Sequence, residues 1–244
     1  MSYLMNIFSD PYEMVMFLLR IPIVLIALSV HEASHGFAAY KCGDPTARNL
    51  GRLTLNPIRH LDPIGTVCML LFGIGWAKPV PVNTRYFKNP RNGMALTACA
   101  GPLSNVIMSF IGIIVFSLIA CLVNPESTVL LLVGFFFYYF HIVNLMLGLF
   151  NLIPIPPLDG SRIAFIFLPD KIYFGIMKYE EIIKIIFLAF LLFSGASLIG
   201  DLASFISDGI MELIIKIPGF DAYEINIFFA RFYSIFQGNG NTLV

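Results

Sequence analysis

The chain has 244 residues, of which 58% are hydrophobic and 12% charged. Soluble domains carry about a quarter charged residues, and a fold of this size could not hide so much apolar surface from water, so lipid must surround much of the chain. The 15 basic and 15 acidic residues balance to zero net charge, which provides no bulk electrostatic attraction for nucleic acid. We therefore predict an all-α membrane protein that binds no nucleic acid.

The first long apolar run follows Pro11, a residue suited to the start of a helix. Residues 14–30 are apolar except for Arg20, and the helical pattern continues to about Tyr40, where residues 43–45 (GDP) end it. At 1.5 Å per residue such a helix can cross a bilayer. The run lacks the small-residue cleavage site of a signal peptide, so we expect a retained transmembrane helix.

The next apolar segment, residues 63–77, is rich in glycine and shorter than the roughly 20 residues that a spanning helix needs. We interpret it as a re-entrant hairpin. Residues 76–83 (WAKPVPVN) contain two prolines and two valines, which favour extended backbone over helix.

Later apolar runs complete a polytopic transmembrane helix bundle with one short re-entrant or β-hairpin element. We expect a single membrane-embedded domain over residues 1–244. Its long runs cover residues 94–123, 129–150 and about 182–200, its core is residues 11–200, and amphipathic segments follow at 202–236.

Basic residues gather between the first and second long runs, where only Asp44 and Asp62 oppose them. The positive-inside rule places this connection in the cytoplasm. If residues 63–77 crossed fully, half of these charges would lie outside. We thus expect a multi-pass protein of the cell membrane with the ends of the first helix and of the 129–150 helix on the cytoplasmic side. The basic residues are Lys41, Arg48, Arg52, Arg59, Lys78, Arg85, Lys88 and Arg91.

Residues 31–35 read HEASH, the pattern H-E-x-x-H. His31 and His35 lie one helical turn apart, so both imidazoles can bind one zinc ion. Glu32 lies about 100° round the helix, within reach of a water activated by that zinc, and can act as general base. The pattern also occurs on ordinary exposed helix faces. Inside a membrane helix, however, a charged side chain costs about 2.5–3.5 kcal/mol and usually has a function.

A catalytic zinc needs a third protein ligand. Lys41 stands where a metzincin-type histidine would be, and the next glutamate after Glu32 is Glu126, in a predicted outside turn. His60 and Asp62 are near in sequence, although polar contacts within the hairpin are their simpler interpretation.

Asp159 is the best candidate for that ligand. It lies in the proline-broken stretch 154–160 (PIPPLDG), on the predicted cytoplasmic side like His35. Broken backbone at membrane depth is tolerated where it lines a watery cavity or is buried in protein. The alternative for Asp159 is an ordinary helix N-cap.

Three motifs in this order resemble the site-2 protease family of intramembrane zinc metalloproteases. They are residues 31–35 (HEASH), 100–105 (AGPLSN) and 144–160 (NLMLGLFNLIPIPPLDG). Two further stretches, 51–65 (GRLTLNPIRHLDPIG) and 75–83 (GWAKPVPVN), resemble the small prokaryotic branch without PDZ or CBS domains.

The resemblance implies one Zn²⁺ per chain and hydrolysis of a peptide bond within or beside a transmembrane helix of a protein or peptide substrate. His31, His35 and Asp159 match the family's metal ligands, and Glu32 matches its catalytic acid/base. Asn151 matches an asparagine that positions substrate or stabilises the oxyanion, with helix–helix hydrogen bonding as the alternative. Residues 75–83 match an element that holds substrate as an added strand.

Other intramembrane polar residues receive structural interpretations: we expect Asn105, His141 and Asn144 to join helices and Arg162 to be an interface anchor. Two other functions compete with the protease. A catalytically inactive membrane chaperone would bind transmembrane segments without cutting them, but the intact Glu32 argues against it. A metal transporter would distribute its ligands along a pathway. The sequence names no substrate and indicates no oligomeric state.

Overall fold

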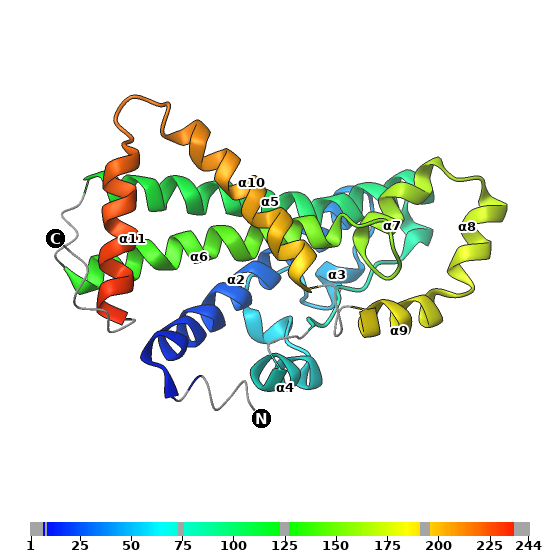
Figure 1. Ribbon diagram of the computed structural model, residues 1–244. Coiled ribbons are helices and arrows are strands. Elements are labelled where there is room, and N and C mark those ends of the chain that lie inside the picture. The colour runs from blue at the N-terminus through cyan, green and yellow to red at the C-terminus, as the bar shows by residue number, and fades with distance from the viewer. Residues whose placement is uncertain (1–6, 8, 73–75, 123–126, 191–195, 237–244) are drawn as a thin grey trace.

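The computed structural model describes residues 7, 9–72, 76–122, 127–190 and 196–236, and no strand forms among them. Three helices are long and apolar enough to cross a membrane: α2 (Pro11–Lys41), α5 (Pro90–Leu122) and α6 (Thr128–Asn151). They confirm the predicted all-α membrane bundle (Figure 1). The segment interpreted as re-entrant begins with the short helix α4 (Pro63–Phe72). Its depth in the membrane stays a prediction, and residues 73–75 lie outside the described part.

Both ends of α2 are fixed by side chains. At the start, the Asp10 carboxylate accepts the N–H of Tyr12 at 2.9 Å. After the last turn, Gly43 adopts φ +108°, a left-handed conformation that suits glycine, and the chain turns into α3 (Thr46–Asn49). The buried Asp44 accepts the N–H of Asn83 at 2.6 Å, which ties the end of α2 to the later 76–83 segment.

Helices α5 and α6 pack closely along their length (Figure 1). Glycines allow this approach, because a Cβ at Gly112 would lie 3.0 Å from the carbonyl oxygen of Phe137 and one at Gly148 would lie 3.3 Å from that of Pro102. Small residues serve the same purpose in many membrane bundles. Helix α2 packs against this pair.

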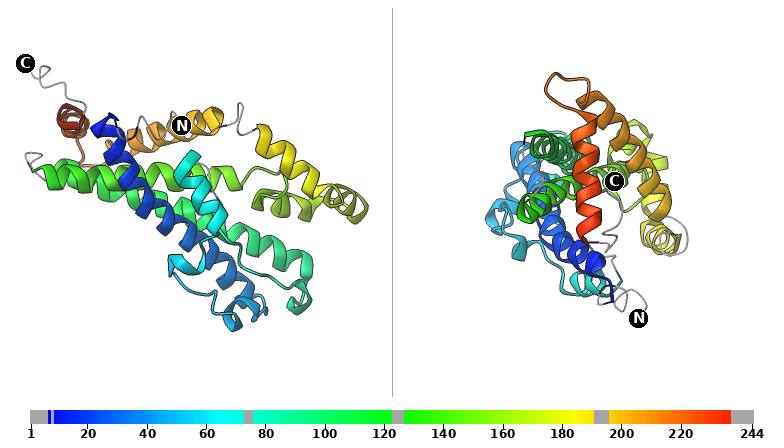
Figure 2. Two further views of the ribbon diagram at one scale, coloured as in Figure 1. Left: turned by 90° about the horizontal axis from the view of Figure 1, so that it is seen from below. Right: turned by 60° about the vertical axis from the view of Figure 1, so that its left-hand side comes forward.

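The C-terminal amphipathic segments form α10 (Ala196–Ile214), which packs along α6, and α11 (Ala222–Phe236), which lies across one end of α5 and α6 (Figures 1 and 2). There Phe232 stacks on Phe135 with ring centroids 3.6 Å apart, and Phe228 meets Phe116 edge-on at 5.5 Å. Aromatic packing therefore holds α11 to the bundle.

Short elements connect these helices. The apolar run expected at about 182–200 covers most of the short helix α9 (Glu180–Phe190) and the start of α10. Residues 191–195, between them, are outside the described part. Residues 76–83 are not helical, and their single sheet-like contact is an antiparallel bridge between Leu61 and Ala77. The connecting elements are η1 (Pro57–Arg59), η2 (Thr84–Tyr86), α7 (Asp159–Ala164), η3 (Phe165–Phe167), α8 (Asp170–Met177) and α9 (Glu180–Phe190).

Candidate metal centre and active-site cleft

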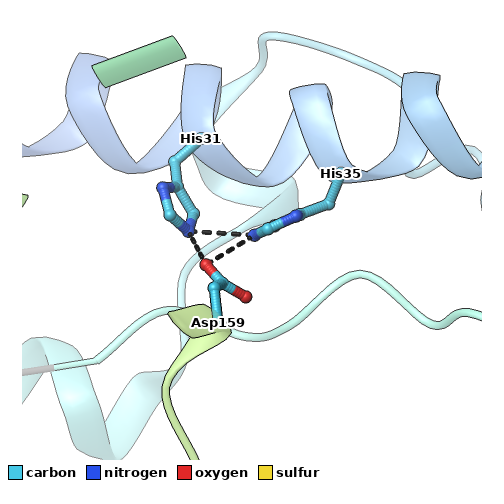
Figure 3. Close-up of side chains that lie close together, drawn as sticks. All are labelled: His31, His35 and Asp159. Carbon is cyan, nitrogen blue, oxygen red and sulfur yellow. Dashed lines mark hydrogen bonds and ion pairs between the residues drawn. The ribbon is translucent and has the colours of Figure 1, made fainter. Parts of the chain in front are cut away.

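Three potential metal ligands converge between α2 and α7 (Figure 3). His31 and His35 project from successive turns of α2, and Asp159 is the first residue of α7, after the loop that follows α6. The two Nε2 atoms lie 3.0 Å apart, and Asp159 Oδ2 lies 3.2 Å from each. The described residues contain no other such group of three histidine, cysteine or carboxylate side chains.

This arrangement fits a zinc ion. Tetrahedral zinc with nitrogen and oxygen ligands at 2.0–2.2 Å keeps the ligand atoms about 3.3–3.5 Å apart, close to the observed separations. Asp159 Oδ2 is buried and has no hydrogen-bond donor among the described residues. A metal ion bound between the two histidines would satisfy this buried oxygen.

The second nitrogen of each imidazole faces an acceptor. His35 Nδ1 lies 2.7 Å from the carbonyl oxygen of Thr97, and His31 Nδ1 lies 2.6 Å from Oδ1 of Asn105. Acceptors at Nδ1 keep the proton on that nitrogen and leave the Nε2 lone pair for a metal. Both rings therefore have the tautomer that a zinc ligand needs.

Gly101 on α5 lies directly against the two rings. A Cβ at this position would overlap the His35 imidazole and lie 2.7 Å from Cε1 of His31. The backbone of α5 thus forms one wall of the centre, and it fits there because residue 101 has no side chain.

Glu32 is buried beside the two histidines. Its Oε2 accepts the N–H of Val80 at 2.8 Å, and its Oε1 has no hydrogen-bond partner in the described part of the chain. The backbone around Val80 is itself held by the buried Arg52, whose Nη2 donates to the carbonyl oxygen of Lys78 at 2.7 Å. The 76–83 segment therefore fixes the direction of the Glu32 carboxylate.

These residues open onto one cleft of about 590 Å³. Asn151 lines it, and its Nδ2 donates to the carbonyl oxygen of Leu147 at 2.9 Å, which leaves one amide hydrogen without an acceptor among the described residues. Arg162 and Glu180 line it as an ion pair at 3.1 Å. The cleft thus brings together every residue that the sequence predicted for the site: His31, Glu32, His35, Asn151 and Asp159.

The other ligand candidates lie elsewhere. His60 Nε2 contacts the carbonyl oxygen of Thr54 at 2.7 Å, and Asp62 accepts the N–H of Gly65 at 2.8 Å, so both make polar contacts local to the hairpin. Sequence reasoning missed the contact of Asn105 with His31. The motif at residues 100–105 was the available signal, but it does not say which helix the amide faces.

Comparison with known proteins matches residues 119–194 to Peptidase family M50. "Putative zinc metalloprotease YwhC" of Bacillus subtilis (strain 168) is 44% identical over 167 residues, which cover 68% of this chain and 76% of YwhC. "Putative zinc metalloprotease Rip2" of Mycobacterium tuberculosis (strain ATCC 25618 / H37Rv) is 32% identical over 142 residues, 56% of this chain and 52% of Rip2.

"Zinc metalloprotease MJ0392" of Methanocaldococcus jannaschii is 29% identical over 160 residues, which cover 66% of this chain and 37% of that protein. No solved structure matches the chain. The helical fold and the cleft are those of a membrane-embedded metal-dependent hydrolase. The chain belongs to peptidase family M50, the site-2 type of zinc metalloprotease.

Proposed function

We propose that the protein is an intramembrane endopeptidase in which His31, His35 and Asp159 hold the zinc ion and Glu32 is the general base. The observation that carries this proposal is the approach of three ligand atoms to within 3.0–3.2 Å of one another, next to a buried carboxylate. Zinc bound there would supply Lewis-acid activation of water.

Two side chains would then act directly on the reaction. Because Val80 occupies Oε2 of Glu32, Oε1 remains to accept a proton from a water in the cleft and later to return it to the leaving amine. The unused amide hydrogen of Asn151 can donate to the carbonyl oxygen of the scissile peptide as negative charge develops on it.

The substrate we propose is a transmembrane protein or peptide, cut at the cytoplasmic side of the cell membrane. The cleft lies where α2 and α6 end, next to the connection that carries eight of the chain's 15 basic residues. A helical substrate satisfies its own backbone groups, so it must unwind locally before a peptide bond can enter the cleft.

Membrane fractions of cells that make the wild type or Glu32→Gln test this proposal by quantitative proteomics. We expect membrane-protein fragments that appear with the wild type and are absent with Glu32→Gln, while zinc content stays equal in the two purified proteins. Identical fragment patterns from two zinc-loaded proteins would contradict the protease and favour the inactive chaperone.

A further inference from the structure

One buried amide joins three helices next to the metal centre. Asn105 on α5 is completely buried, and its Oδ1 lies 2.6 Å from Nδ1 of His31 on α2. Its Nδ2 donates to Oδ1 of Asn144 on α6 at 2.9 Å and to the carbonyl oxygen of Ala27 on α2 at 3.3 Å. Each polar atom of this amide therefore has a partner.

The directions of the hydrogen bonds from Asn144 to Asn105 to His31 follow from the acceptor at the far end of the series, the carbonyl oxygen of Phe140. The backbone carbonyl of Phe140 can only accept, so Asn144 donates to it through Nδ2, at 2.9 Å, and presents Oδ1 to Asn105. Asn105 must then donate through Nδ2 and present Oδ1 to His31. Consequently His31 carries its proton on Nδ1 and directs the Nε2 lone pair toward His35 and Asp159.

We propose that Asn105 is a positioning residue of the zinc centre, which sets the tautomer and ring orientation of His31, and that Asn144 in turn fixes Asn105. This inference rests on the ligand set proposed above. It identifies His31 as the ligand that depends on a side chain of another helix. His35 is oriented instead by the backbone carbonyl of Thr97, which no side-chain substitution removes.

The neighbouring turn provides a matched comparison. Ser109, four residues after Asn105 on α5, also makes a buried hydrogen bond across to α6, where its Oγ lies 2.8 Å from Nδ1 of His141. His141 Nε2 continues to Ser207 on α10 at 3.0 Å and contacts neither the ligands nor the cleft. Ser109→Ala removes this side-chain hydrogen bond between helices without touching a ligand, and the carbonyl oxygen of Ser109, 3.0 Å from Nδ1 of His141, stays in place.

Zinc affinity, measured by chelator competition on detergent-purified protein, tests the proposal. We expect Asn105→Leu to bind zinc about 10–100-fold more weakly, the range found when an outer partner of a histidine ligand is lost. Asn105→Asp keeps an acceptor for Nδ1 but loses the donor to Asn144 and Ala27, so it should recover only part of this loss. It should also shift the visible absorption bands of the cobalt-substituted protein, because a carboxylate partner increases electron donation from His31. Ser109→Ala should bind zinc like the wild type.

Wild-type affinity in folded Asn105→Leu would overturn the proposal, and so would an equal loss in Ser109→Ala. If Asn105→Leu does not fold, the smaller change Asn105→Ala decides, and a zinc affinity equal to the wild type would refute the positioning role. Asn144→Leu leaves Asn105 Nδ2 bonded to the carbonyl oxygen of Ala27, so an unchanged affinity there would refute only the part assigned to Asn144. Asp159→Ala separates the two levels of inference. Zinc retained by Asp159→Ala refutes the ligand set, whereas zinc lost there but retained in Asn105→Leu refutes only the positioning role.

Discussion

The two ends of the α5–α6 pair are held together in different ways. At one end, which we call the aromatic end, Phe116 of α5 and Phe135 of α6 pack against Phe228 and Phe232 of α11. At the other, the site end, glycines bring the helices close and hydrogen bonds join them. Its residues are Gly101, Asn105, Asn144 and Gly148.

This difference separates stability from function within one pair of helices. Contacts between aromatic rings are numerous and only weakly directional, so the aromatic end stabilises the fold as a whole. At the site end the hydrogen bonds are directional, and one acceptor, Asn105 Oδ1, faces the proposed ligand His31. Changes at the aromatic end should therefore lower stability, whereas changes at the site end should first lower zinc affinity.

Among changes to the residues of the site end, the largest effect on zinc is expected from Gly101→Ala. The added methyl group would overlap the His35 ring and push it out of the centre. Since this displaces a ligand rather than its partner, zinc affinity should fall by more than about 100-fold, while helix content by circular dichroism stays unchanged. A Gly101→Ala protein that binds zinc like the wild type would contradict the difference between the two ends, because the His35 ring would then have moved aside without loss of zinc affinity.

Gly134→Ala is the matched change at the aromatic end. Its methyl group would overlap the ring of Phe228, so the surrounding aromatic residues must shift. Overpacking of this kind costs about 1–3 kcal/mol, and we expect a lower thermal unfolding temperature in detergent with zinc content equal to that of the wild type. Loss of zinc without loss of thermal stability would reverse the assignment of the two ends.

A smaller effect is expected at the wall of the cleft from Arg52→Gln. It removes the donor to the carbonyl oxygen of Lys78, so the N–H of Val80 no longer holds Glu32 in one direction. Turnover of a substrate found by the proteomic comparison should fall about tenfold, with zinc content unchanged. The control is Arg48→Gln, because the exposed Arg48 side chain contacts the hydroxyl and the ring of Tyr40 and does not line the cleft. Equal losses in both variants would argue against a specific role for Arg52.

The sequence predicted the parts of the molecule that depend on local pattern. The span of α2 follows from its apolar run and from the turn at Gly43, and the spacing of His31 and His35 follows from helical geometry. Asp159 was the best candidate ligand because prolines break the chain before it and because the histidine and glutamate of two other zincin patterns are absent. These signals lie within one segment or depend on membrane topology.

Contacts between helices could not be predicted in the same way. The polarity of Asn105 indicates a helix junction, but only the packing shows that its Oδ1 faces His31. The predicted substrate-binding strand is a similar case, and strand addition stays a prediction. Pro79 and Pro81 have no N–H, and the N–H of Val80 is bonded to Glu32, so this segment has few donors left for a substrate.

The most direct test of the central claim is the zinc content of purified Asp159→Ala after dialysis against a weak chelator. Asp62→Ala is the matched control, since Asp62 was the competing carboxylate and its side chain accepts the N–H of Gly65 within its own hairpin. We predict about one zinc per chain for the wild type and for Asp62→Ala, and far less for Asp159→Ala. Full zinc occupancy in Asp159→Ala would contradict the ligand set His31, His35 and Asp159.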